Sequence, residues 1–197
     1  MKVRAARQAA TALASVMLLA AGCSSGSTSN PDPAPTGVTV APPSTTQAGT
    51  PAEQTALTEA ITRYWTVYSS VYNNPRQDMA IVDTVAAGEE AASLRDQAAQ
   101  VAAQGIVSSG VIKLVKLTVT SVAPSPVAGG PTTANVITCN DVSANTGVDP
   151  SGKSVVNPNR LPQTKTSFHL QNPTPQNPSG WRVSQGRSGP TIPCDPS

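Results

Sequence analysis

The sequence is poor in the side chains that carry most enzyme chemistry. Among 197 residues it has one histidine, three cysteines and 11 Asp and Glu, and charged residues make up only 12% of the chain. It contains no H-E-x-x-H motif and no S-x-x-K motif, which excludes two common routes to hydrolysis. We therefore expect neither a bound metal nor a cofactor.

Long apolar runs are absent beyond the N-terminus. The first 22 residues combine three cations, Lys2, Arg4 and Arg7, with an uncharged and mostly apolar run from Ala9 to Ala21, which is the pattern of an export signal. A membrane-spanning helix needs roughly 20 apolar residues, and no later segment has such a run. We expect residues 1–22 to be a signal peptide, so that any membrane attachment of the mature protein is made at its new N-terminus.

A cysteine follows this signal directly. The stretch Leu18-Leu19-Ala20-Ala21-Gly22-Cys23 resembles the lipobox of bacterial lipoproteins, with Ala20 where leucine is commonest. The resemblance implies that Cys23 receives a diacylglycerol thioether, whose two acyl chains anchor a protein stably. The expected location is the cell membrane, on its extracytoplasmic face. The alternative is an ordinary secretory signal, with Cys23 a spare thiol.

Charge argues against nucleic acid as a partner. Removing the signal removes three of the 13 Lys and Arg, which leaves ten against 11 Asp and Glu and a net charge of about −1. No cluster of basic residues of the kind that binds phosphate backbones is present. The expected partners are the membrane, through the N-terminal lipid, and an envelope protein or a small apolar ligand.

Composition divides the mature chain into a tether and a domain. Residues 23–49 consist mainly of Ser, Thr, Pro, Gly and Ala, with Asp32 as the only charge, so they cannot build a core. We expect a disordered, semi-rigid tether there. Residues 50–197 are expected to form one α+β globular domain.

The domain is predicted to begin with a helix. Thr50 suits its N-cap, Pro51 its first position, and Glu53 completes a capping box. Apolar and aromatic residues then recur at spacings of three and four, which predicts one buried helix face. They are Leu57, Ile61, Tyr64, Trp65, Tyr68, Val71 and Tyr72.

Two further helices are predicted before the first strand. Asp78–Ala86 suits a short helix, and Gly88–Gln104 a longer one that stops at Gly105. The apolar stripe of the longer helix consists of Ala91, Leu94, Ala98 and Val101, and the residues expected to face water are Glu89, Glu90, Arg95, Asp96, Gln97 and Gln100.

The rest of the chain has β character. Strands are predicted at Val111–Val122, Ala134–Cys139, Thr164–Leu170 and Gly180–Gly186, separated by Pro- and Gly-rich loops. Helices followed by antiparallel strands indicate an α+β fold with the N-terminal helices packed on one face of the sheet.

Cys139 and Cys194 remain as an even pair in an oxidising compartment, which predicts a disulfide. The competing interpretation is a redox or metal site. That interpretation requires closer cysteines or nearby histidines, and the sequence has neither.

Three features resemble a group of actinobacterial secreted proteins and lipoproteins and, more distantly, the NTF2-like superfamily of cone-shaped α+β domains. They are the aromatic first helix with Tyr64-Trp65 and Tyr68, the Cys139-Asn140-Asp141 turn, and the strand Gly180-Trp181-Arg182-Val183. The resemblance implies a curved sheet wrapped against a long helix, with a pocket between them. Enzymes of that superfamily use a carboxylate or a histidine inside the cone.

The aromatic residues have two interpretations. They fill the core of a domain otherwise built of Ala, Val and Thr, or some of them form the wall of an apolar ligand pocket between helix and sheet. The six candidates are Tyr64, Trp65, Tyr68, Tyr72, Phe168 and Trp181.

Few residues are candidates for catalysis. His169 falls on the polar face of its predicted strand, and Asp78, Asp83 and Asp141 have plainer roles as helix-start, exposed-face and turn residues. We therefore expect a lipid-anchored, non-enzymatic binding or accessory domain of the cell envelope. The alternative is an NTF2-like enzyme of the isomerase or cyclase type that acts on a small apolar substrate.

Overall fold

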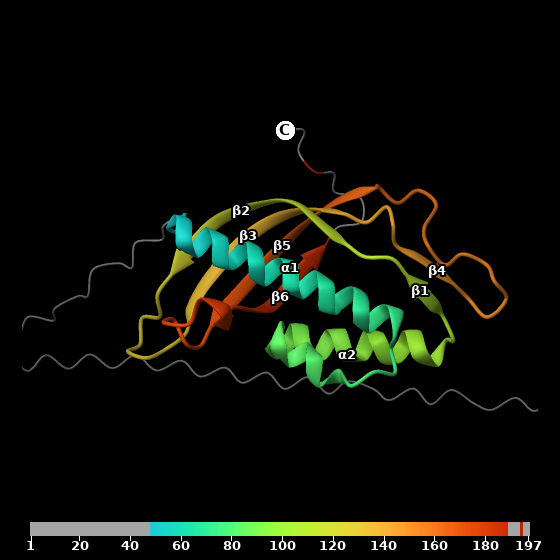
Figure 1. Cartoon of the computed structure of the whole chain (residues 1–197), viewed down its shortest axis with the longest axis horizontal. Coiled ribbons are helices and arrows are strands. Elements are labelled where there is room, and N and C mark those ends of the chain that lie inside the picture. The colour runs from blue at the N-terminus through green and yellow to red at the C-terminus, as the bar shows by residue number, and fades with distance from the viewer. Residues whose placement is uncertain (1–47, 189–193, 195–197) are drawn as a thin grey trace, which may run out of the picture. The chain divides into compact units, whose positions relative to one another are not determined.

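The computed structural model describes residues 48–188 and Cys194, and within this part the chain is an α+β domain. Two helices, α1 (Pro51–Asn73) and α2 (Gly88–Ala103), precede a four-stranded antiparallel sheet. Figure 1 shows α1 lying across one face of that sheet. The predicted class, N-terminal helices on an antiparallel sheet, is confirmed. The predicted signal peptide and Cys23 lie outside the described residues.

The first helix begins where its capping residues predict. The Thr50 hydroxyl accepts a hydrogen bond from the Glu53 amide at 3.3 Å, and the Thr50 amide donates to Glu53 Oε2 at 2.7 Å. This reciprocal pair satisfies two of the amides that a helix start leaves unpaired. Pro51 occupies the first turn, where its missing N–H costs nothing.

The helix between α1 and α2 is shorter than predicted and is of the 3₁₀ type. A 3₁₀ helix, η1 (Met79–Thr84), replaces the expected helix over residues 78–86, and the Asp78 carboxylate caps it by accepting from the Ala80 amide at 2.9 Å. Helix α2 ends at Ala103, and Gly105 follows with φ +65°. Glycine adopts that left-handed conformation without steric cost, so it stops the helix as predicted.

The main sheet has the strand order β2–β3–β5–β6, and every neighbouring pair is antiparallel. Its strands, β2 (Lys113–Ala123), β3 (Thr132–Asp141), β5 (Gln163–Asn172) and β6 (Arg182–Ser188), confirm the four predicted ones. Two register shifts interrupt β2 and one interrupts the β5–β6 pair. Such bulges bend a strand, and the strands curve in Figure 1.

A second, two-stranded sheet was not predicted. It pairs β1 (Val107–Ser109) with β4 (Thr146–Val148). Strands of three residues are too short to show an alternating pattern, which explains why the sequence gives no signal for them. A short 3₁₀ turn, η2 (Pro178–Gly180), precedes β6.

The inward face of the sheet changes character along its length. On β3, Ala134 and Val136 are buried at one end, and Thr138 and Asn140 at the other. Strand β5 repeats the change: Leu170 and Phe168 pair with the apolar end, and Thr166 and Thr164 with the polar end. The apolar end packs into the core with the N-terminal half of α1, where Leu57 and Ile61 are fully buried. Under the C-terminal half of α1, the sheet presents smaller polar side chains, which fill less space than the apolar residues at the other end.

The predicted disulfide is confirmed. Cys139 and Cys194 are joined, with their Cα atoms 5.5 Å apart and a separation of 55 positions in sequence. Because Cys139 alternates with the buried residues Thr138 and Asn140, its side chain lies on the outer face of β3. The bridge ties a residue close to the C-terminus to a central strand.

Candidate functional site

A cavity of about 310 Å³ opens between the C-terminal half of α1 and the polar end of the sheet. We call it the α1–sheet cavity. The C-terminal half of α1 is held at this end of the sheet by a hydrogen bond, which Ser69 Oγ accepts from the Ile112 amide just before β2. Residues of β1, β4, β5 and β6, and of the β1–β2, β3–β4 and β4–β5 loops, complete its lining.

Three of the six predicted aromatic residues line this cavity. Trp65, Tyr68 and Tyr72 follow one another along α1; the rings of Tyr68 and Tyr72 are stacked with centroids 4.5 Å apart, and Trp65 meets Tyr68 edge-on at 5.2 Å. Successive spacings of three and four place these side chains on one face of the helix. They form a continuous aromatic wall.

The other three aromatic residues are part of the core. Tyr64, Phe168 and Trp181 are 2%, 3% and 4% exposed, and the rings of Tyr64 and Phe168 meet edge-on with centroids 5.3 Å apart. The structure thus brings Tyr64 and Phe168 against the aromatic wall from behind, and neither they nor Trp181 lines the cavity. Trp65, at 6% exposed, belongs to the core as well as to the cavity lining, so the two interpretations do not divide the aromatic residues cleanly, and a ligand against them stays a prediction.

Two of the three tyrosine hydroxyl groups donate hydrogen bonds to α2. Tyr64 Oη donates to Glu90 Oε1 at 2.5 Å, and Tyr72 Oη donates to Gln97 Oε1. The expectation that Glu90 and Gln97 face water was therefore wrong, since both are half-buried. A buried tyrosine requires a partner for its hydroxyl, and the helix face that looks polar in the sequence supplies it.

All three tyrosines resist ionisation. Burial is the main cause that raises the pKa of Tyr64, Tyr68 and Tyr72, and the negative charge of Glu90 adds to the effect. A phenolate in this environment would lose its hydration without gaining a cation. The aromatic wall therefore stays neutral over the physiological pH range.

The floor of the cavity is polar and hydrogen-bonded. Thr164, Thr166 and Ser188 line it, and the hydroxyl oxygens of Thr166 and Ser188 lie 3.0 Å apart. Beneath them Asn140 is fully buried, and its Nδ2 donates to Thr138 Oγ1 at 2.9 Å and to Thr166 Oγ1 at 3.1 Å. These two hydrogen bonds hold the Asn140 amide nitrogen in place, whereas its Oδ1 is buried without a partner among the described residues.

The rim comes from segments that sequence reasoning did not single out. Asn73 Nδ2 donates to the Gly110 carbonyl at 2.9 Å, and Arg160 Nη2 donates to the Asn145 carbonyl at 2.8 Å. Gly110 has φ +97°, and a Cβ at this position would lie 2.1 Å from the Ala144 carbonyl oxygen. Only glycine fits here, and this contact between two loops gives no signal in a single sequence.

The cavity lacks the usual groups of acid–base catalysis. Among the described residues that line it there is no Asp, Glu, His or Cys, and Arg160 is the one charged side chain. General acid–base chemistry needs a titratable group within hydrogen-bond reach of the substrate. The lining instead offers aromatic faces, hydroxyl groups, amides and one guanidinium group.

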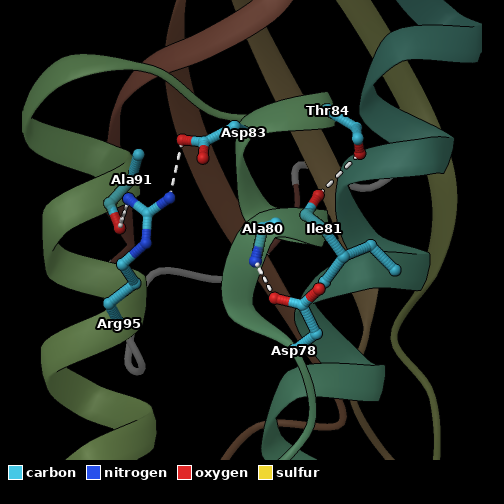
Figure 2. A network of polar contacts seen from close by, with 7 residues as sticks. All are labelled: Asp78, Ala80, Ile81, Asp83, Thr84, Ala91 and Arg95. Carbon is cyan, nitrogen blue, oxygen red and sulfur yellow. Dashed lines mark hydrogen bonds and ion pairs between the residues drawn. The ribbon is translucent and has the colours of Figure 1, made fainter.

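Two predicted candidates lie in the segment between the helices. Figure 2 shows Asp78 capping η1 and Asp83 directed toward Arg95 of α2. The Asp83 Oδ1 to Arg95 Nη2 distance is 2.6 Å, with the Asp83 side chain 65% exposed. Both carboxylates have structural partners and neither lines the cavity.

The other two candidates are also outside the cavity. Asp141 accepts a hydrogen bond from the Ser143 amide at 2.9 Å, and its hydrogen bonds to Ser143 lower its pKa. His169 Nδ1 lies 3.0 Å from Asn135 Oδ1 on the outer face of the sheet. The turn role of Asp141 and the polar-face position of His169 agree with the sequence prediction.

One motif in the sequence is not used in the way its pattern indicates. Residues 147–154, GVDPSGKS, match the phosphate-loop pattern G-x-x-x-x-G-K-S, which requires a strand before the loop and a helix after it. Here the chain turns back on itself, and Val148 bridges Ser154. The Asp149 carboxylate accepts from the Ser151 and Lys153 amides at 2.9 and 3.0 Å. A carboxylate takes the amides that a phosphate would need.

No metal centre is formed by the part of the chain that the structure covers: no three His, Cys, Asp or Glu side chains come together there. Across residues 48–188, no helix is both long and apolar enough to cross a membrane.

Comparison with known proteins provides no family. No protein-family model matches the chain, and no curated protein sequence matches it. Among solved structures, the intermembrane space region of the chloroplast protein ARC6 is 18% identical, with a TM-score of 0.47 over 68% of this chain and 94% of that one. A de novo designed β-sheet protein is 14% identical, with a TM-score of 0.30 over 69% of this chain and 88% of that one.

Proposed function

We propose that this protein is a lipid-anchored binding domain of the cell envelope, which holds a small, mostly apolar ligand in the α1–sheet cavity. The observation that carries the proposal is the composition of the cavity lining. Trp65, Tyr68 and Tyr72 offer apolar contact area at low entropic cost, and the polar floor fixes orientation. This combination suits binding.

The size and setting of the cavity support the same proposal. Its volume of about 310 Å³ is at the lower end of the range of small-molecule sites. Its floor is held by hydrogen bonds from the buried Asn140 to Thr138 and Thr166. The helix-on-curved-sheet arrangement supports the resemblance to NTF2-like domains, whereas the absence of a carboxylate or histidine from the described lining favours binding over catalysis.

A fluorescent probe tests the binding site. N-phenyl-1-naphthylamine is neutral and apolar and emits strongly when it leaves water. We expect saturable binding to the purified protein, because the aromatic wall shields the probe from solvent. Ser109→Phe places a ring at the exposed rim and should weaken binding at least tenfold, which corresponds to about 1.4 kcal/mol.

The matched control is Ser167→Phe, the same change at an exposed position on the outer face of β5. Its affinity for the probe should equal that of the unmodified protein. Equal binding by both variants would place the probe elsewhere and contradict the proposal.

A separate experiment tests the anchor. A bacterial host that produces the protein is fed an alkyne analogue of palmitate, and its membranes are fractionated. We expect label on the membrane-associated protein, no label on Cys23→Ser, and unchanged label on Ser24→Ala. Unchanged labelling of Cys23→Ser, or an unlabelled soluble parent protein, would refute the lipid anchor and leave the cavity proposal standing.

A further inference from the structure

We infer that the ligand of the α1–sheet cavity is an organic anion, with an apolar ring or chain against the aromatic wall and one acidic group bound by Arg160. This inference rests on the proposed function and names the ligand class for that site. It is carried by the charge of the lining and by two polar atoms of lining residues that have no hydrogen-bond partner among the described residues.

Arg160 is the first part of the argument. It is half-buried and lines the cavity, and the one hydrogen bond of its guanidinium group among the described residues, to the Asn145 carbonyl, fixes that group in place. It forms no ion pair with any residue in the described part of the chain. Guanidinium has five N–H donors in a planar fork that matches a carboxylate. A single neutral contact leaves most of these donors available.

The electrostatic setting makes an anion the favoured occupant. A cation that is partly removed from water is costly unless an opposite charge approaches it, and no described acidic residue shares the cavity lining. The three tyrosines stay neutral because their pKa values are raised by burial. A cationic ligand would meet Arg160 with no compensating carboxylate in that lining.

Three buried side-chain polar atoms of the described residues have no hydrogen-bond partner, and two of them belong to residues that line the cavity. Trp65 Nε1 is buried without a hydrogen-bond partner among the described residues, and it is a donor only. An acceptor oxygen of a ligand that reaches this N–H would give it a partner. Asn145 Oδ1 is a buried acceptor, and a hydroxyl or amino group of a ligand that reaches it would donate to it. The third atom, Asn140 Oδ1, belongs to the residue beneath the floor.

A pair of matched probes tests the inference. 8-anilino-1-naphthalenesulfonate has the same anilinonaphthalene body as N-phenyl-1-naphthylamine plus one sulfonate group. We expect the purified protein to bind the sulfonate probe about tenfold more tightly at low ionic strength, which corresponds to about 1.4 kcal/mol. Added salt should weaken binding of the sulfonate probe and leave the neutral probe unaffected.

Variants separate charge from structure. Arg160→Gln should remove the preference for the sulfonate probe and leave the affinity for the neutral probe unchanged, and Arg160→Lys should restore part of the preference. Arg187→Gln, the same loss of charge at an exposed outer-face position, should bind both probes as the unmodified protein does. Partial unfolding of Arg160→Gln would increase binding of the sulfonate probe, which is opposite to the expected change.

The possible outcomes are distinct. Equal affinities for the two probes, or a preference that survives Arg160→Gln, would overturn the anion assignment, while saturable binding sensitive to Ser109→Phe would keep the proposed binding site. Binding of neither probe, or binding unaffected by Ser109→Phe, would overturn both.

Discussion

Alkaline pH should unfold this domain through its tyrosines. All three tyrosines of the chain lie on one face of α1, and burial raises each pKa above the ordinary 10.0. Below pH 10 each tyrosine is neutral in both the folded and the unfolded chain, so their contribution to stability is fully present. Above pH 10 the unfolded chain releases protons that the folded chain retains, and stability falls as pH rises.

The expected loss follows from the number of protons. One proton difference changes the free energy of unfolding by about 1.36 kcal/mol per pH unit. Three tyrosines that stay neutral in the folded state therefore give a slope of up to about 4 kcal/mol per pH unit. Domains are stable by about 5–15 kcal/mol, so unfolding should occur within a few pH units above 10.

Absorbance of tyrosinate at 295 nm and circular dichroism at 222 nm, followed on the same samples, measure this effect. The two signals should change together in one cooperative transition, well above the tyrosine titration midpoint in 6 M guanidinium chloride. Tyr68→Phe retains a ring and removes one titrating group, so it should reduce the slope by about a third. Tyrosinate absorbance that appears near pH 10 while the circular dichroism stays native would refute the reasoning.

Three other substitutions test the framework of the fold. Replacing Cys139 and Cys194 together by serine removes a bridge across 55 residues and should cost up to about 4 kcal/mol in urea unfolding; an unchanged midpoint would show that the bridge does not constrain the chain. Gly110→Ala should cost roughly 1–3 kcal/mol and lower the thermal midpoint, and a neutral effect would contradict the close loop contact. Asp83→Asn should change stability by less than about 1 kcal/mol, because its ion pair with Arg95 is exposed. A larger loss of stability in the same urea assay would contradict the expectation that an exposed ion pair contributes little.

The elements that depend on local chemistry could be predicted from the sequence. Thr50 and Glu53 form the expected capping box, and Gly105 stops α2 in a left-handed conformation. The four long strands have enough residues to show β character, and the two cysteines left after Cys23 form the expected disulfide. Each of these predictions depends on a few neighbouring residues or, for the disulfide, on the number of cysteines.

The cavity depends on contacts that no local pattern encodes. The sequence singled out the aromatic residues, but it could not separate Trp65, which lines the cavity, from the adjacent Tyr64, which does not, since both are buried. That difference depends on where α1 crosses the sheet. Arg160 comes from a loop of no regular pattern, and its position near β4 depends on a two-stranded sheet that the sequence does not indicate.

The polar floor was hidden for a different reason. Thr164 and Thr166 alternate correctly for an inward face, but hydroxyl side chains on a strand are as common on the outside. Only the pairing with Asn140 on β3 shows that they form a buried polar layer. The change from an apolar to a polar inward face is therefore a property of two paired strands.

Indole N–H signals in a ¹H–¹⁵N correlation spectrum test the binding site most directly, because the chain has two tryptophans and the structure places them differently. Trp65 lines the α1–sheet cavity, whereas Trp181 is buried in the core. On titration with 8-anilino-1-naphthalenesulfonate, the Trp65 signal should shift to saturation with the same dissociation constant as the fluorescence change, and the Trp181 signal should stay in place. A Trp65 signal that does not move while the probe binds would contradict the assignment of this cavity as the ligand site.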